Sequence, residues 1–224
     1  MPSVFVLAHQ SGRVSWVITV MASHEQTLQQ TTEIKLTREE QIALKNRRNG
    51  VTIFQVSWIM AFVCLTVVNL QIRWNFPSWP PEGVAALDRV LPTIVTIGLI
   101  VSMWSARQGL KVLQVGNYQK FTRHWKLSIG LGIAFILGMA FQWITADVGS
   151  QYNTIFRLMV AFHGFHAFVI LIWMATVKLD AEGASTDEAP IYNPIKHWKI
   201  EASVRLWDFV VVAWLMFYVV LYIL

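Results

Sequence analysis

Residues Gly50–Ile72 read GVTIFQVSWIMAFVCLTVVNLQI, and this stretch decides the fold because none of its 23 positions carries a charged side chain. An α-helix rises about 1.5 Å per residue, so a helix of this length exceeds the ~30 Å hydrocarbon thickness of a bilayer. The stretch therefore predicts a transmembrane helix.

Four further apolar stretches follow the first one. Together they predict five spans, at about residues 50–72, 90–112, 127–147, 155–178 and 203–224. The chain is 55 % hydrophobic, has a mean hydropathy of +0.47 and is only 14 % charged, against about a quarter in soluble domains. One water-soluble core of this length would not hide so much apolar surface. We predict an all-α polytopic membrane protein, a bundle of five transmembrane helices over residues 50–224.

Residues 1–49 are predicted to form a polar cytoplasmic segment with a short juxtamembrane helix. Thr37 followed by Glu40 is a capping-box pattern, and the helix is expected to end at Asn49-Gly50. The start of the chain lacks the basic region of a secretory signal. The sequence is equally consistent with a mature chain that includes residues 1–20 and with one that starts at Met21.

Lysine and arginine predict the orientation, because cytoplasmic loops are enriched in both. The basic connections are those before the first span, between the second and third, and before the fifth; they hold Lys45, Arg47, Arg48, Arg107, Lys111, Lys120, Arg123, Lys126, Lys178, Lys196 and Lys199. The opposite connections hold Arg73, Arg89 and Arg157. The N-terminus is therefore predicted inside and the C-terminus outside. The net charge of +5 lies in these short clusters, so we expect no nucleic-acid partner.

Of the six histidines, only His163 and His166 lie inside a predicted span. Their i, i+3 spacing places both rings near one helix face, so joint ligation of a metal or haem is one interpretation. The other, which we favour, is that each imidazole hydrogen-bonds a neighbouring helix. A single cysteine, Cys64, excludes any site built on two thiolates. We predict no catalytic, metal-ligating or cofactor-binding residue.

Two patterns predict helix contacts. Gly130, Ala134 and Gly138 recur at every fourth position and predict a small-residue seam for close helix approach. Glu201, Arg205 and Asp208 share one face at the start of the fifth span, where we expect Asp208 to pair with Arg205. One interpretation is that these three charged side chains neutralise one another at the membrane interface. The other is that Arg205 and Lys178 contact lipid phosphates.

Four blocks, in this order, resemble subunit III of the haem-copper oxidases (the cytochrome c oxidase subunit III family) in its short five-span form. The blocks are Trp79–Gly83 (WPPEG), Leu91–Thr93 with Thr96 and Ser102, Phe162–His166 (FHGFH) and Glu201–Leu215 (EASVRLWDFVVVAWL). The resemblance covers about Gly50–Leu224.

The chain departs from the family pattern at four polar positions. Asp208 stands where the family has His, and Val211 where it has Asp. Trp58 corresponds by position to a buried Glu that is linked to proton uptake in the long form, and Gln142 occupies a place often held by Glu. A proton-uptake role is therefore not carried over.

The resemblance implies a non-catalytic subunit of an oxygen-reducing, proton-translocating oxidase of the respiratory chain in the bacterial cytoplasmic membrane. It would pack on catalytic subunit I and on subunit II, which hold the haem and copper, and it could bind phospholipid. One Cys and two intramembrane His are too few for those metal centres. The residues expected to pack against other helices or subunits are His163, Gly164, His166, Trp207, Phe209 and Trp214, besides the small-residue seam.

Two alternative functions stay open at the level of sequence. One is an accessory subunit of a nitric oxide reductase or quinol oxidase, which would differ in its partner and substrate. The other is a small transporter or channel, which an inverted repeat with paired broken helices would favour; the sequence has no such repeat. The electron donor and the haem type are not encoded in this chain.

Overall fold

The computed structural model describes residues 36–183 and 192–224, with side chains up to residue 178 in the first range. Every regular element within these ranges is helical: α2 (Arg38–Trp74), α3 (Val90–Gln114), α4 (Tyr118–Thr145), α5 (Gln151–Gly183), α6 (Pro194–Tyr218) and a final π-helical turn (Val219–Ile223). In the described part, five helices are long and apolar enough to cross a membrane. The all-α, five-span prediction is confirmed.

The chain divides into two compact units, Met1–Gln41 and Ile42–Leu224. In the described residues of the first unit, the capping box is present. The backbone N–H of Thr37 donates to Oε2 of Glu40 at 2.9 Å, and the N–H of Glu40 donates to Oγ1 of Thr37 at 3.3 Å. The expected helix end at Asn49-Gly50 is wrong, because α2 continues through it to Trp74. A glycine in the interior of a helix lowers the stability of that helix by only about 1 kcal/mol relative to alanine. This loss is too small to end a helix that continues into an apolar span.

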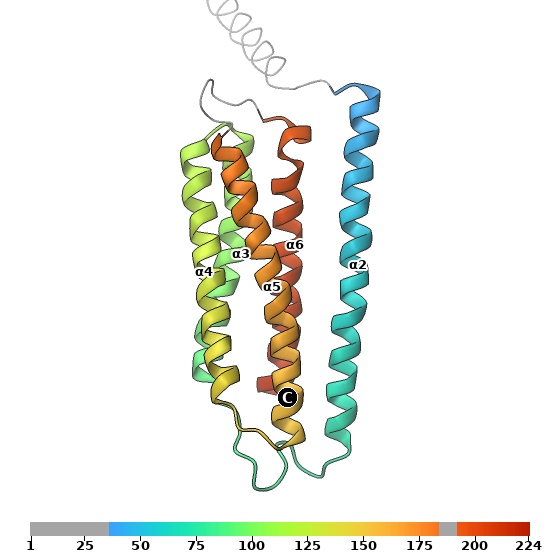
Figure 1. Cartoon of the computed structure of the whole chain (residues 1–224), viewed down its shortest axis with the longest axis vertical. Helices are drawn as coiled ribbons and strands as arrows, with labels where there is room; N and C mark the ends of the chain where they lie inside the picture. Colours follow the sequence, from blue (N-terminus) through green and yellow to red (C-terminus); the bar gives the residue numbers. More distant parts are fainter. Residues whose placement is uncertain (1–35, 184–191) are drawn as a thin grey trace, which may run out of the picture. The chain divides into compact units, whose positions relative to one another are not determined.

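Within the second unit, α3, α4, α5 and α6 pack as a group in which α3 contacts α4 and α6, and α5 contacts α4 and α6 (Figure 1). Helix α2 runs beside this group and joins it through large aromatic side chains. Phe62 of α2 lies 5.1 Å from Phe162 and 5.5 Å from Phe209, measured between ring centroids. Only Leu44, Phe62 and Asn69 of α2 are buried, so most of this helix is exposed in the isolated chain.

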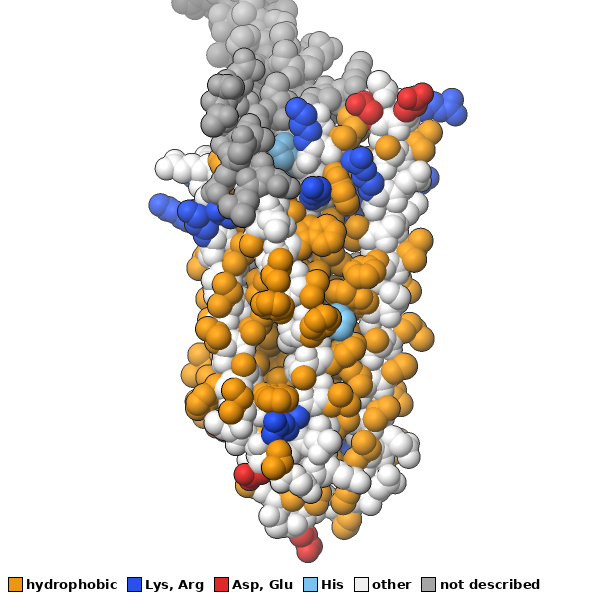
Figure 2. Space-filling model, viewed as in Figure 1, with side chains coloured by type: hydrophobic (Ala, Val, Ile, Leu, Met, Phe, Trp, Pro, Cys, Tyr) orange, Lys and Arg blue, Asp and Glu red, His pale blue; other side chains and the backbone are white. Residues whose placement is uncertain are grey.

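The core is centred on α6, whose Trp207, Trp214 and Phe217 are completely buried. Hydrophobic side chains cover the flanks of the molecule, and lysines and arginines gather mainly towards the end where α2 and α6 begin (Figure 2). An apolar flank between charged ends is the surface that a bilayer-spanning bundle presents to its surroundings.

Two helices begin earlier than their hydrophobic stretches. Helix α4 starts at Tyr118, after Asn117, whose side chain accepts a hydrogen bond from the N–H of Lys120. Helix α6 starts at Pro194, after Asn193, which caps the helix in the same way. Asn at the N-cap and Pro in the first turn are both favoured helix starts, so hydropathy alone misplaced these ends by about nine residues.

The three members of the small-residue seam have different surroundings in the structure. A Cβ added at Gly138 would lie 2.8 Å from Cγ1 of Val95, so this glycine does permit close approach of α3. Gly130 and Ala134 are exposed, and a Cβ added at Gly130 meets nothing within 4 Å. The second close approach is instead at Gly132, where an added Cβ would lie 2.8 Å from both Leu171 and Trp207. Within the described part of this chain, Gly138 is therefore the member of the predicted seam that lies against another helix, and packing of Gly130 and Ala134 on another subunit stays a prediction.

Candidate functional site

Two tryptophans of α6 form hydrogen bonds to α3 in the buried core. The indole N–H of Trp207 donates to Oγ of Ser102 at 2.9 Å, and that of Trp214 donates to Oγ1 of Thr96 at 2.8 Å. Both pairs lie where water is excluded, so each donor and acceptor has its partner only in this alignment. The two bonds fix the register of α6 against α3.

Two further tryptophans link α4 to α5, one near each end. The indole N–H of Trp125 donates to the carbonyl of Met174, and that of Trp143 donates to the carbonyl of Arg157, both at 2.9 Å. The guanidinium of Arg157 also lies over the ring of Trp143, 4.0 Å from its centroid. A cation held this close to an aromatic face is attracted to it. The four helices are therefore joined by directional contacts as well as by apolar packing.

The two histidines of α5 have different surroundings. His163 is 1 % exposed and lies among aromatic rings, 5.0 Å from Trp214 and 5.6 Å from Phe135 between centroids. His166 packs edge-on against Trp58 of α2 at 4.4 Å. The structure therefore places one ring in the core and the other at the contact with α2.

The predicted hydrogen bonds from these histidines to neighbouring helices do not form among the described residues. Nδ1 of His166 lies 2.7 Å from the carbonyl of Phe162 in its own helix. Neither ring nitrogen of His163 has a hydrogen-bond partner in the described part of the chain. The spacing of the pair was a correct guide to their position on the helix, but it carried no information about their partners.

The other predicted packing residues lie in or beside the same region. Phe209 is buried, and its ring centroid lies 6.3 Å from that of Trp58 on α2. Gly164 lies beside His163, and a Cβ added to it would meet nothing within 4 Å. Gly164 therefore faces open space instead of a neighbouring helix of this chain.

Asp208 forms an ion pair, but not with Arg205. Nε of Arg107 on α3 lies 3.0 Å from each of its two carboxylate oxygens. Arg205, the partner expected from the i, i+3 spacing, is exposed. The pair between Arg107 and Asp208 is partly buried, with 24 % of the Asp208 side chain exposed. A pair between Arg205 and Asp208 on the exposed surface of one helix would stabilise the protein by only a few tenths of a kcal/mol. The cross-helix pair is therefore the more favourable of the two.

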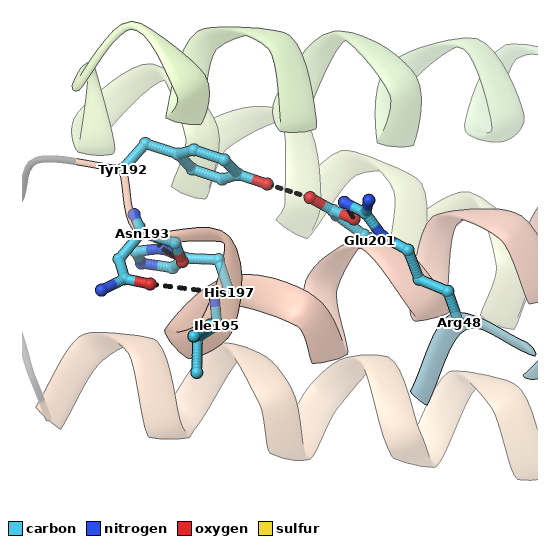
Figure 3. A network of polar contacts seen from close by, with 6 residues as sticks. All are labelled: Arg48, Tyr192, Asn193, Ile195, His197 and Glu201. Carbon is cyan, nitrogen blue, oxygen red and sulfur yellow. Dashed lines mark hydrogen bonds and ion pairs between the residues drawn. The ribbon is translucent and has the colours of Figure 1, made fainter. Parts of the chain in front are cut away.

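Glu201 also pairs with a different helix. Its Oε2 accepts a hydrogen bond from Nη2 of Arg48 on α2 at 2.6 Å, while the hydroxyl of Tyr192 donates to its Oε1 (Figure 3). Burial raises the pKa of the Tyr192 hydroxyl above its ordinary value, and the hydrogen bond to Glu201 raises it further. The carboxylate thereby joins α2, α6 and the segment that leads into α6.

The N-terminus of α6 is held by local contacts next to this carboxylate. The Asn193 side chain accepts a hydrogen bond from the backbone N–H of Ile195 at 2.8 Å (Figure 3). It also accepts one from the backbone N–H of Lys196 at 3.4 Å. The rings of Tyr192 and His197 are stacked, with centroids 5.2 Å apart. Lys178, the other predicted lipid contact, is half-buried near the end of α5.

A polar network that sequence reasoning missed lies at the opposite end of the helices. The amide of Gln142 donates to the carbonyl of Asp88 at 2.7 Å, and its oxygen accepts a hydrogen bond from the hydroxyl of Tyr222 at 2.5 Å. The hydroxyl of Tyr152 accepts a hydrogen bond from the N–H of Leu87 at 3.3 Å. The sequence alone marks Gln142 only as a residue in a place often held by Glu in the family pattern. The sequence signal that could have predicted this network is the presence of polar side chains, such as Gln142 and Tyr222, near the ends of apolar stretches.

Comparison with known proteins identifies a family. The profile of the family described as cytochrome c oxidase subunit III matches residues 10–224. The match begins well before Gly50, where the resemblance noted in the sequence begins, and includes every helix described above.

Similar curated proteins carry the same description. A cytochrome c oxidase subunit 3 from Synechocystis sp. is 26 % identical over 181 residues, covering 80 % of this chain and 76 % of that protein. One from Thermostichus vulcanus is 27 % identical over 179 residues, covering 78 % and 86 %. A probable cytochrome c oxidase subunit 3 from Mycobacterium leprae is 24 % identical over 194 residues, covering 79 % and 89 %.

Proposed function

Since the chain belongs to the cytochrome c oxidase subunit III family, we propose that it acts as the non-catalytic subunit of a respiratory haem-copper oxidase and stabilises the catalytic subunit during turnover. Its role as subunit III of such an oxidase follows from the family and from similar proteins of that description. In this proposal the chain holds no catalytic group, contacts the partner subunits of the oxidase and lies in the bacterial cytoplasmic membrane.

The proposal rests on the hydrogen bonds and ion pairs that polar side chains of α6 form with neighbouring helices. Trp207 and Trp214 donate to α3, Asp208 pairs with α3, and Glu201 pairs with α2. A scaffold has to keep one shape while a neighbouring subunit carries out the chemistry. Directional contacts in a low-dielectric interior favour a single arrangement of helices, because each misaligned alternative strands a polar group.

The proposed partners are catalytic subunit I and subunit II, which would hold the haem and copper. The exposed flank of α2 is available for contact with a neighbour in the membrane. Its outward apolar side chains include Ile53, Val56, Met60 and Val67, each more than half exposed in the isolated chain. Such a flank packs equally well against lipid chains or the helices of another subunit. Bound phospholipid therefore belongs to the same proposal.

Removal of this chain from the native complex tests the proposal. The oxidase should keep its haem spectrum, because the metal ligands lie in other subunits. It should begin turnover at a substantial rate and then lose activity early, because its supporting contacts are gone. Optical spectra and continuous oxygen-consumption traces of the purified complex, with and without the chain, measure both effects.

The double substitution His163→Ala and His166→Ala provides the opposing test. It should leave the haem and copper content of the assembled complex unchanged. Loss of one stoichiometric haem or copper, with the catalytic subunit still present, would falsify the non-catalytic assignment. Immediate loss of all activity on removal of the chain, with an intact haem spectrum, would contradict a purely supporting role.

A further inference from the structure

Four aromatic side chains form a continuous row across the junction of α2 and α5, which we call the aromatic strip. Phe54 and Trp58 of α2 have ring centroids 4.5 Å apart, and His166 and Phe165 of α5 have theirs 5.7 Å apart. Trp58 and His166 join the two halves at 4.4 Å, with their ring planes nearly perpendicular. Phe54 is 46 % exposed and Phe165 is 65 % exposed, so both ends of the strip reach the surface of the isolated chain.

His166 presents a hydrogen-bond acceptor in this strip. Its Nδ1 lies 2.7 Å from the carbonyl oxygen of Phe162, and because a carbonyl only accepts, Nδ1 carries the proton. A charged imidazole inside an apolar span is costly, so the ring is neutral and Nε2 keeps a lone pair. Within the described residues, no hydrogen bond reaches this Nε2.

Trp58 presents a hydrogen-bond donor beside it. Its indole N–H has no acceptor in the described part of the chain, in contrast to those of Trp207 and Trp214. Trp58 and His166 are both half-buried. The enclosed polar atoms that lack a partner among the described residues include both nitrogens of His163, but neither the indole nitrogen of Trp58 nor Nε2 of His166. Both atoms therefore keep accessible surface, and a neighbour can reach them.

The two atoms lie inside the hydrocarbon layer. The span of α5 runs from Gln151 to Lys178, which leaves about 22 Å of helix on one side of His166 and about 18 Å on the other. Trp58 contacts this ring and therefore lies at a similar depth. Water and the ester oxygens of lipids stay at the membrane interface, and lipid chains have neither donors nor acceptors. Lipid alone would leave both polar groups unpaired, at a cost in free energy.

A transmembrane helix of another protein supplies the missing partners. Ser, Thr, Asn and Gln side chains form hydrogen bonds between helices inside membranes, and the backbone of a helix holds such a side chain at one depth. A hydroxyl or an amide both donates and accepts, so one side chain can pair with Trp58 and His166 together. Exposed aromatic rings such as Phe54 and Phe165 are typical of the cores of protein interfaces.

We propose that the aromatic strip is the docking surface for a transmembrane helix of a partner subunit of the oxidase. A hydroxyl or amide side chain of that helix accepts a hydrogen bond from the indole N–H of Trp58 and donates one to Nε2 of His166. Apolar side chains of the same helix pack on Phe54 and Phe165. This docking rests on the proposed function, because the helix belongs to the same complex.

Photo-crosslinking in the native complex tests the docking. The variant Phe165→p-benzoylphenylalanine is assembled into the oxidase, the purified complex is irradiated, and mass spectrometry identifies the crosslinked peptide. We expect a membrane-spanning peptide of another subunit that carries Ser, Thr, Asn or Gln near its centre. Phe141→p-benzoylphenylalanine is the matched control, because Phe141 of α4 is 62 % exposed but lies outside the strip. It should not crosslink to that peptide.

Two further variants test the hydrogen bonds themselves. Trp58→Phe and His166→Phe keep an aromatic ring and remove the polar atoms. Each should raise the dissociation constant of this chain from the complex about threefold to tenfold, the effect of one lost hydrogen bond. The fraction of the chain that stays bound on serial dilution in detergent measures this constant. Trp104→Phe removes an exposed indole N–H outside the strip and should leave the constant unchanged.

Failure of the docking and failure of the proposed function give different results. A chain that does not co-purify with the haem and copper subunits overturns both. In an intact complex, three crosslinking results at position 165 overturn the docking alone: products with lipid only, with a second copy of this chain, or with a helix that has no central hydroxyl or amide. Unchanged dissociation constants for both Trp58→Phe and His166→Phe overturn the proposed hydrogen bonds in the same way.

Discussion

At the scale of single residues, Asp208 and Arg107 show how a partly buried ion pair replaces a local one. Nε of Arg107 lies 3.0 Å from both carboxylate oxygens, and half of the Arg107 side chain is exposed. Removing one partner of a fully buried pair costs about 3–5 kcal/mol. The cost here should be smaller because water still reaches the guanidinium.

Asp208→Asn should lower the free energy of unfolding by about 1–2 kcal/mol, because it leaves Arg107 without its counter-charge. Adding Arg107→Gln should recover part of that loss, since the stranded charge is then removed as well. Thermal unfolding in detergent measures both. Arg205→Gln is the control and should change little; a loss as large as that of Asp208→Asn would restore Arg205 as the partner.

A second residue-scale prediction concerns the buried indole of Trp214. Thr96→Val keeps the shape of the side chain but removes the acceptor for the indole N–H, so stability should fall by about 1–2 kcal/mol. Thr176→Val is the matched control, because that hydroxyl is exposed and bonds only to its own helix. Thermal unfolding of both variants checks the difference, and equal midpoints would show that the indole bond adds nothing.

The sequence could reveal the existence of the five helices but not these partners. Bilayer thickness imposes a minimum length on each apolar run, so hydropathy detects the spans directly. Sequence spacing, in contrast, reports only neighbours on the same helix. Arg107 and Asp208 are 101 positions apart, and no local pattern joins them. The failed pairing with Arg205 and the unexpected network around Gln142 have this same cause.

At the scale of helices, close approach is decided by which glycine faces a neighbour. Gly132 lies two residues after Gly130, so the two point to different sides of α4. An added Cβ at Gly132 would lie 2.8 Å from Trp207, a completely buried ring that has little room to move. A four-residue repeat recognises a stripe of small residues, but it does not show whether a helix lies against that stripe.

Gly132→Ala should therefore destabilise the protein by about 1–3 kcal/mol, the usual cost of overpacking a core. Gly130→Ala should be neutral or stabilising by up to about 1 kcal/mol, because alanine is the better helix former and its Cβ meets nothing. Thermal unfolding of the two variants gives the comparison. A larger loss at Gly130 would mean that the original seam is the contact face.

At the scale of the whole molecule, the number of spans and the basic residues together determine the orientation. Three spans, α4, α5 and α6, separate Gly116 from Leu224, so these two positions should lie on opposite sides of the membrane. The connection at Gly116 is flanked by Lys111 and Lys120, and cytoplasmic loops carry the excess of Lys and Arg. Gly116 is therefore expected inside and Leu224 outside.

Reporter fusions test this topology directly. A fluorescent protein that folds only in the cytoplasm should be bright when joined after Gly116 and dark when joined after Leu224. A phosphatase that is active only outside should give the reverse pattern. Two bright fusions would mean that an even number of spans separates the two positions, so that one helix among α4, α5 and α6 does not cross. The reverse pattern for both reporters would keep the five spans and overturn only the orientation, because span number follows from hydropathy whereas direction follows from charge.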